Sequence, residues 1–384
     1  MGMRNFVDKI KPTFTKGGKL GFLESTFDAF ETFLFVPNTT TRRGAHIRDC
    51  NDMKRTMIMV VVALVPALLF GMYNTGYQHF LSIGQTPEFW ASFWFGFLKV
   101  LPMIVVSYVV GLGIEFMFAQ LRGHEVNEGF LVSGLLIPMI MPVDIPLWIL
   151  GLSTAFAVIF GKEVFGGTGM NVFNPALVAR VFAFLAYTPS MSGTKVWIAG
   201  MTAGEGVVDG FSGATPLENL VTTGSMGYSP MDAFLGFIPG SVGETSTLAI
   251  LIGAAVLLFT GIASWRTMVS VFAGGLAMAL VFNLCGTSEY AQIPCWHHLI
   301  VGGFAFGAVF MATDPVTSAQ TATGQYIVGA LIGILAVLTR VINPAYPEGM
   351  MLAILFMNAM APLVDYYVVE ANIKRRNKRL TTAK

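Results

Sequence analysis

The segment DGFSGATPLE, residues 209–218, is a short polar stretch that divides the chain into two strongly hydrophobic halves. It combines an acidic residue, Asp209, with a turn of small residues and a threonine, Thr215, that is followed by Pro216. The letters T-P-L-E have the form of a capping box with proline at the first helical position, which predicts that a helix begins here. The same hydroxyl is also a group to which a cofactor can be attached, so two interpretations of Thr215 are open.

Apolar residues dominate the rest of the chain. Of its 384 residues, 54% are hydrophobic and 12% are charged, and a soluble core would not bury so much apolar surface. We therefore predict an integral membrane protein in contact with lipid. The formal net charge of +1 gives no electrostatic support for nucleic-acid binding, so no such partner is expected.

Ten hydrophobic segments follow a polar amino-terminal region, and a helix needs about 20 residues to cross the hydrocarbon core. They lie at approximately 56–73, 91–120, 129–142, 146–161, 170–187, 245–263, 267–284, 299–313, 324–341 and 349–369. Several are short or contain Gly and Pro. Broken helices are tolerated at membrane depth where the freed backbone is buried in protein or lines a polar cavity.

Lys and Arg flank the hydrophobic region at both ends, which places both termini on the cytoplasmic side. An even number of crossings satisfies this orientation, and ten crossings leave residues 209–218 outside. Within the first 55 residues, apolar positions from Phe22 to Leu34 recur at steps of three and four, which predicts an amphipathic helix. It would lie on the membrane surface, against another subunit or on the cytoplasmic face of this chain.

Motifs recur in the same order in the two halves of the chain. GFLKVLP (96–102), EGFLVSG (128–134) and GMNVFNPALV (169–178) are followed by GFIPG (236–240), LIVGG (299–303) and GMMLAILFMNAMAPLV (349–364). Five spans in each half would orient the halves oppositely, and transporters with inverted repeats place their sites at the repeat interface. We predict an all-α membrane fold of ten transmembrane helices in two inverted five-helix repeats.

These observations divide the chain into five parts. They are a basic cytoplasmic region (1–55), a first membrane repeat (56–187), an external segment (188–230), a second membrane repeat (231–369) and a basic cytoplasmic tail (370–384).

The residues around Thr215 also fit a modification motif. Asp209, Ser212, Gly213, Ala214 and Thr215 match the pattern D-x-x-[ST]-G-A-T, which resembles the target of flavin transferases. With RRGAHIRDCNDMKR (42–55), GHEVNEGF (123–130), KEVFGGTGMNVFNPALVARVF (162–182) and ANIKRR (371–376), the chain resembles the B subunit of the sodium-translocating NADH:quinone oxidoreductase over nearly its whole length. The D subunit of the Rnf complex shares the motif, but the long basic amino terminus and GHEVNEGF favour the quinone-reducing enzyme.

This resemblance implies a urea-transporter-like fold in the bacterial inner membrane and a set of cofactors and partners. FMN would be joined to Thr215 by a phosphoester that a flavin transferase makes, with residues 209–214 as its recognition sequence. Riboflavin would be a further redox group, and electrons would pass to a quinone while Na⁺ crosses the membrane. NADH would be oxidised on another subunit, in agreement with the lack of a G-x-G-x-x-G motif in a strand-helix unit here.

GHEVNEGF precedes the third hydrophobic segment, and the resemblance favours a quinone pocket around Glu128, Gly129 and Phe130. A carboxyl group at the interface can supply a proton to a quinone oxygen, and glycine lets the ring approach closely. The alternative is that these polar residues form only the solvated end of a helix. The glycines of GGTGMN (166–171) lack the Lys of a phosphate loop, so we expect them to open a half-helix inside the membrane instead.

Charged residues at membrane depth are costly and therefore candidates for function. They are Glu115, Asp144, Arg180, Glu244, Asp314, Glu348 and Asp365. Asp144, Asp314 and Asp365 are candidate Na⁺ ligands, because Na⁺ prefers oxygen ligands of this kind. Ion pairing between helices, for example with Arg180, is the simpler interpretation of any single acid.

Three other functions compete with the quinone reductase subunit. A D subunit of an Rnf-type ferredoxin:NAD oxidoreductase would carry the same flavin, whereas a solute channel or transporter would carry none, and a structural anchor for redox partners would bind no quinone. The cysteines Cys50, Cys285 and Cys295 contain no C-x-x-C pair, which argues against an iron-sulfur cluster. Cys285 and Cys295 are either disulfide-bonded or free.

Overall fold

The computed structural model describes residues 3–15, 53–122, 129–202, 204, 207, 208, 211–286, 290–343 and 348–382, with positions 18, 20, 21, 27, 31, 35, 41 and 43–47. Every regular element in these ranges is a helix, so the predicted all-α class is confirmed. The predicted amphipathic helix near Phe27 lies almost entirely outside the described residues. So do Asp209 and Glu128.

Among the described residues, six helices are long and apolar enough to cross a membrane. They are α3 (Met53–Ser82), α4 (Phe89–Arg122), α6 (Leu147–Gly161) with its 3-10 extension η2 (Glu163–Phe165), α12 (Trp265–Cys285), α15 (Ala322–Ile342) and α16 (Met350–Thr382). Three apolar helices are shorter, namely α5 (Phe130–Ile140), α7 (Pro175–Ala186) and α11 (Thr247–Phe259). The helix lengths therefore identify a membrane protein in which long and short helices are combined.

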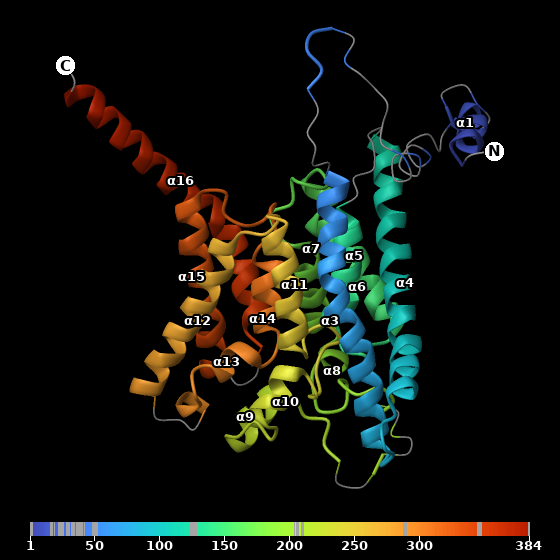
Figure 1. Ribbon diagram of the computed structural model, residues 1–384, viewed down its shortest axis with the longest axis vertical. Coiled ribbons are helices and arrows are strands. Elements are labelled where there is room, and N and C mark those ends of the chain that lie inside the picture. Colours follow the sequence, from blue (N-terminus) through green and yellow to red (C-terminus); the bar gives the residue numbers. More distant parts are fainter. Residues whose placement is uncertain are drawn as a thin grey trace.

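The long helices form two groups, with the short helices between them (Figure 1). One group contains α3, α4 and α6, and the other contains α12, α15 and α16. Glycine permits the close packing of α12 on α15, because a Cβ at Gly274 would collide with the Ala330 carbonyl and one at Gly333 with the Val271 carbonyl. Small residues at crossing points are the usual means by which membrane helices approach each other.

The eighth hydrophobic segment, 299–313, is one of the broken helices that the sequence led us to expect. It consists of α13 (His297–Ile300), α14 (Phe304–Phe306) and the π-helix η4 (Gly307–Met311). Gly302, with φ +66°, interrupts the helix, because residues other than glycine rarely adopt this conformation. α5 likewise ends at Ile140, and Met141 is extended before a turn at Val143 and Asp144 leads to the start of α6.

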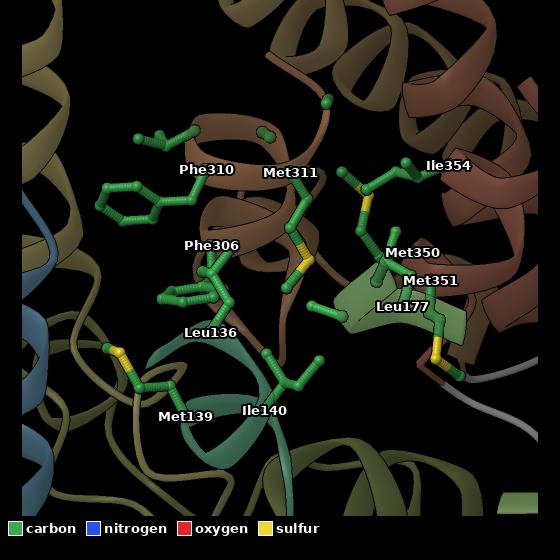
Figure 2. Close-up of a cluster of buried hydrophobic side chains, with 14 of the residues drawn as sticks. Leu136, Met139, Ile140, Leu177, Phe306, Phe310, Met311, Met350, Met351 and Ile354 are labelled. Atoms are coloured by element: carbon green, nitrogen blue, oxygen red, sulfur yellow. The ribbon is translucent and has the colours of Figure 1, made fainter. Parts of the chain in front are cut away.

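The buried core gathers these broken helices (Figure 2). Leu136, Met139 and Ile140 of α5 face Phe306, Phe310 and Met311 of the broken segment, and Leu177 of α7 packs with Met350, Met351 and Ile354 of α16. The Gly243 amide, just before α11, donates to the Met139 carbonyl at 2.7 Å and so satisfies one free carbonyl near the end of α5.

The glycine-rich stretch 166–171 does not begin a helix, contrary to our expectation. Gly166, Gly167 and Gly169 have φ of 118°, 97° and 90°, which are incompatible with a right-handed helix. α7 begins at Pro175 instead, and Asn174 is its N-cap, with Oδ1 accepting from the Ala176 amide at 3.0 Å.

Two ends of the bundle can be distinguished in Figure 1. The start of α3 and the end of α16 lie at one end, and the short helices α8 (Thr188–Met191), α9 (Pro216–Thr223) and α10 (Pro230–Leu235) lie at the other. We call the second of these the Thr215 end. The opposite end is called the Asp314 end, because Asp314 shares a cavity there with Thr56 near the start of α3.

Candidate functional site

Thr215 is the N-cap of α9, as the sequence predicted. Its backbone is extended, with φ −70° and ψ 157°, and its Oγ1 accepts a hydrogen bond from the Glu218 amide at 3.3 Å. Pro216 occupies the first helical position and Gly224, with φ 71°, ends the helix. The capping interpretation is confirmed, and it leaves the hydroxyl at the start of a helix, where backbone N–H groups favour an anion.

The small residues before Thr215 form a tightly packed turn. The Ala214 amide donates to Ser212 Oγ at 3.3 Å, and the Tyr228 hydroxyl donates to the Ala214 carbonyl at 3.4 Å. A Cβ at Gly213 would collide with the carbonyl of Thr194. The motif residues 212–214 therefore position Thr215, and glycine is required at 213 by the close approach of the neighbouring backbone.

A cavity of about 250 Å³ lies beside Thr215. Residues of α9 between Thr215 and Thr222 line it together with Trp197. Arg180 and Glu244 line it as well, so its lining combines apolar surface with charged groups. Small-molecule sites commonly have volumes of about 300–1,000 Å³, and this cavity lies just below that range, so a ligand that it holds must be compact.

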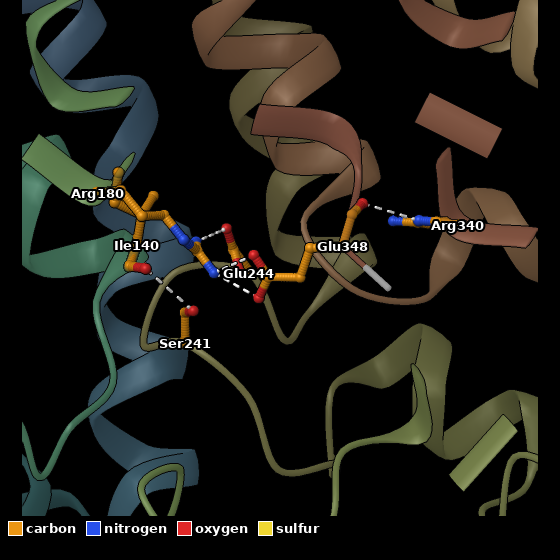
Figure 3. A network of polar contacts seen from close by, with 6 residues as sticks. All are labelled: Ile140, Arg180, Ser241, Glu244, Arg340 and Glu348. Atoms are coloured by element: carbon orange, nitrogen blue, oxygen red, sulfur yellow. Dashed lines mark hydrogen bonds and ion pairs between the residues drawn. The ribbon is translucent and has the colours of Figure 1, made fainter. Parts of the chain in front are cut away.

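A network of four charged residues borders this cavity (Figure 3). Arg180 donates from Nη1 to Glu244 Oε1 at 2.7 Å and from Nη2 to both carboxylate oxygens of Glu348. Arg340, which is fully buried, donates from Nε to the Glu348 carbonyl at 3.0 Å and from Nη1 to the His298 carbonyl at 2.7 Å. The predicted pairing of membrane acids with Arg180 is confirmed, and two cations balance two anions.

Thr245 is a lining residue that the sequence did not single out. Its side chain is 4% exposed, and its Oγ1 has no hydrogen-bond partner among the described residues. Buried hydroxyls normally have a partner, so an unsatisfied one in a cavity wall marks a place where a ligand can bind. An isolated threonine next to Glu244 carries no sequence signal that could have revealed this.

A second cavity, of about 90 Å³, lies at the Asp314 end. Gly129, Thr168, Asn174 and Asp314 are among its lining residues, so the fold brings together one predicted quinone residue and one predicted Na⁺ ligand. The Asn174 amide donates to Asp314 Oδ2 at 3.3 Å and thereby joins the two halves of the chain. Phe130 is fully buried.

A buried ion pair lies next to the second cavity. Lys162, which lines that cavity, donates to the carboxylate of Glu115, and both side chains are 4% exposed. Arg122 pairs with Glu163 at 3.2 Å nearby. Sequence reasoning identified Glu115 as a membrane acid but did not assign Lys162 as its partner.

The three predicted Na⁺ ligands do not meet in one place. Asp144 accepts from the Gly200 amide at 2.9 Å at the Thr215 end, and Asp314 accepts from Thr317 Oγ1 at 3.0 Å at the other end. Asp365 accepts from the Gln320 amide at 2.6 Å, near the start of α15. Within the described ranges, His, Cys, Asp and Glu form no group of three or more that could hold a metal ion.

Cys285 and Cys295 are both free thiols in the structure. The sequence left open whether this pair forms a disulfide or remains as free thiols, and the structure contains the free thiols.

The profile described as the NQR2, RnfD, RnfE family matches residues 40–374. The B subunit of the Na(+)-translocating NADH-quinone reductase of Ectopseudomonas mendocina (strain ymp) is 48% identical, covering 99% of this chain and 100% of the relative. The B subunits of the reductases of the same name from Chromohalobacter salexigens and Azotobacter vinelandii are each 47% identical over 99% of this chain, and cover 97% and 100% of their own lengths.

Proposed function

Because the chain belongs to the NQR2, RnfD, RnfE family, we propose that it is the B subunit of a Na⁺-translocating NADH-quinone reductase. The observation that carries this proposal is the identity of 46–48% to B subunits of such reductases over 99% of the chain. The chain is thus one membrane subunit of an oxidoreductase complex and works together with the other subunits of that complex.

Membranes of a strain that lacks this subunit test the proposal. They should lose Na⁺-stimulated reduction of quinone by NADH, and production of the chain should restore it. Full activity without the chain would contradict the proposal. Exchange of electrons with ferredoxin in place of quinone would instead identify an Rnf-type complex, whose D subunit belongs to the same family.

FMN joined to Thr215 is the cofactor that we propose for the Thr215 end. Three observations support it: the hydroxyl lies at the start of α9, the cavity opens beside it, and the unpartnered Thr245 hydroxyl lines that cavity. The amide groups at the helix start would face the phosphate, and the preceding residues 212–214 would present Thr215 to the flavin transferase. When bound, FMN supplies one-electron and two-electron transfer.

Mass spectrometry of the peptide that contains Thr215 tests this attachment directly. The peptide should carry FMN when the chain is produced together with a flavin transferase, and Thr215→Ala should remove it without preventing membrane insertion. Thr223, an exposed threonine of the same helix, provides the control, because Thr223→Ala should leave the flavin in place. An unmodified wild-type peptide would refute the attachment.

At the Asp314 end we propose that a quinone binds near Glu128, Gly129 and Phe130. Gly129 and Thr168 both line the second cavity and pack closely against each other. Riboflavin is proposed as a further redox group of the complex.

Na⁺ is proposed to contact Asp144, Asp314 and Asp365 at separate points, since these acids lie apart. Each Asp→Asn variant should raise the Na⁺ concentration that gives half-maximal quinone reduction. If an Asp→Asn variant leaves the Na⁺ dependence unchanged, the replaced residue is not a contact point for Na⁺.

We propose ten crossings in two inverted five-helix repeats, α3 to α7 and α11 to α16, with both termini in the cytoplasm of a bacterium. The short helices α5 and α14, which occupy corresponding places in the two halves, support this arrangement. A membrane-impermeant maleimide applied outside spheroplasts should label a cysteine introduced at exposed Thr222 but not one at exposed Lys374. Labelling of both positions, or only of Lys374→Cys, would contradict the topology.

A further inference from the structure

The cavity beside Thr215 extends from the N-cap hydroxyl of α9 to the charged network. Leu217, Val221 and Ile238 give it apolar surface, and Trp197 adds an aromatic ring. Hydroxyl and charged side chains line it as well, among them Thr245, Arg180 and Glu244, so a flat ring in the cavity could be oriented by hydrogen bonds.

Two of the polar groups have properties that a ligand would use. Thr245 is 4% exposed and its Oγ1 lacks a partner among the described residues, so a buried hydroxyl is available in the wall. Arg180 lines the same cavity, and its side chain is 4% exposed. Its guanidinium forms ion pairs with Glu244 and Glu348. A cation held in this way is in position before any ligand arrives.

We infer that this cavity holds the isoalloxazine ring of the flavin on Thr215, with Thr245 and Arg180 as the residues that orient the ring and set its reduction potential. This inference rests on the proposed attachment of FMN to Thr215. The phosphate would remain at the start of α9, and the ring would extend inward between α9 and Trp197.

The chemistry of the ring explains why these two residues suit it. The pyrimidine edge of a flavin carries two carbonyl oxygens and a ring nitrogen, which accept hydrogen bonds and gain negative charge when the ring is reduced. A buried hydroxyl and a nearby cation stabilise that charge more strongly than water does, because the surroundings have a low dielectric constant. Glu218, Glu244 and Glu348 line the same cavity and oppose this charge, so loss of Arg180 or of the Thr245 hydroxyl should shift the flavin toward its oxidised form.

Thr245→Val tests the hydroxyl without changing the size of the side chain. In the purified complex this variant should shift the reduction equilibrium of the flavin on Thr215 toward the oxidised form by about two- to tenfold, the range expected for one hydrogen bond. Thr267→Val is the matched control. Thr267 is 1% exposed, its Oγ1 also has no partner among the described residues, and it does not line this cavity.

Arg180→Lys and Arg180→Gln test the cation. The potential of the flavin on Thr215 should fall more in the Gln variant than in the Lys variant, because lysine keeps the charge but loses the fork that binds two acids. For one electron, a tenfold shift of the equilibrium corresponds to about 59 mV. Equal potentials in wild type and both variants would overturn the role of Arg180.

Accessibility of the flavin to iodide tests the location of the ring independently of its potential. Iodide should quench the fluorescence of the covalent flavin several-fold less in the native complex than in the unfolded chain. Thr222→Trp, which fills the cavity from α9 without altering the charged network, should remove most of this protection.

The outcomes separate this inference from the function on which it rests. A peptide without flavin at Thr215 overturns both. Flavin on Thr215 that iodide quenches equally well before and after unfolding, with a potential that Thr245→Val leaves unchanged, overturns the inference and leaves the attachment standing.

Discussion

Arg180 of α7 and Glu244, which precedes α11, are 64 positions apart in the chain and form an ion pair of 2.7 Å. They belong to different halves of the molecule, so this pair ties the halves together beside the cavity at Thr215. Glu348, at the start of α16, completes the cluster from a third part of the chain.

Replacement of Arg180 should be strongly destabilising. Arg180→Ala leaves the carboxylates of Glu244 and Glu348 buried without their cation, which should lower the free energy of unfolding by about 3–5 kcal/mol. Denaturant unfolding in detergent measures this. The exposed pair Lys374 and Glu370 provides a comparison, because Lys374→Ala should cost about 0–1 kcal/mol. Similar losses in the two variants would show that the Arg180 pairs contribute no more than a surface contact.

Gly129→Ala should weaken quinone binding by crowding the second cavity. A Cβ at Gly129 would lie 2.5 Å from Thr168 Cγ2, so Thr168 must move into the space that it now borders. The KM for quinone should rise several-fold. Thr168→Ser removes that methyl group, so the double variant Gly129→Ala, Thr168→Ser should recover most of the lost affinity. A double variant no better than Gly129→Ala would rule out this steric explanation.

Asp365 should have a structural role that can be separated from any contact with Na⁺. It accepts from the amides of Gln320 and Thr321 at 2.6 and 3.1 Å and so fixes the start of α15. Asp365→Ala leaves both donors without this partner and should cost about 1–3 kcal/mol of stability. Asp365→Asn keeps one acceptor oxygen and should cost less. Thermal unfolding of both variants measures the difference, and equal losses would contradict the capping role.

Glu218 should make the stability of the Thr215 end depend on pH. Partial burial raises the pKa of Glu218 above its ordinary value of 4.5, so the folded chain binds this proton more tightly than the unfolded chain. The contribution of this proton to the free energy of unfolding is fully present below pH 4.5, and it is lost as pH rises through the pKa of Glu218 in the folded chain. Glu218→Gln should remove this part of the pH dependence above pH 4.5, as proteolysis of the 211–224 segment would report. An unchanged pH profile would contradict it.

Local features of the site could be predicted from the sequence. The cap at Thr215 depends on four adjacent residues, T-P-L-E, and the structure contains it as expected. The apolar composition of the long helices likewise revealed a membrane protein. The glycine-rich stretch 166–171 was misjudged, because its three left-handed glycines delay the start of α7 to Pro175.

The sequence by itself determined what depends on neighbouring residues, namely helix starts, apolar helices and the motif at Thr215. Only the tertiary structure decided which distant side chains share a cavity. Glu348 meets Arg180 across 168 positions, Asp314 meets Asn174 across 140, and Thr245 lines the cavity with a buried hydroxyl that has no partner among the described residues. The physical reason is that capping and hydrophobicity act within one segment, whereas these contacts arise where broken helices from both halves pack end to end.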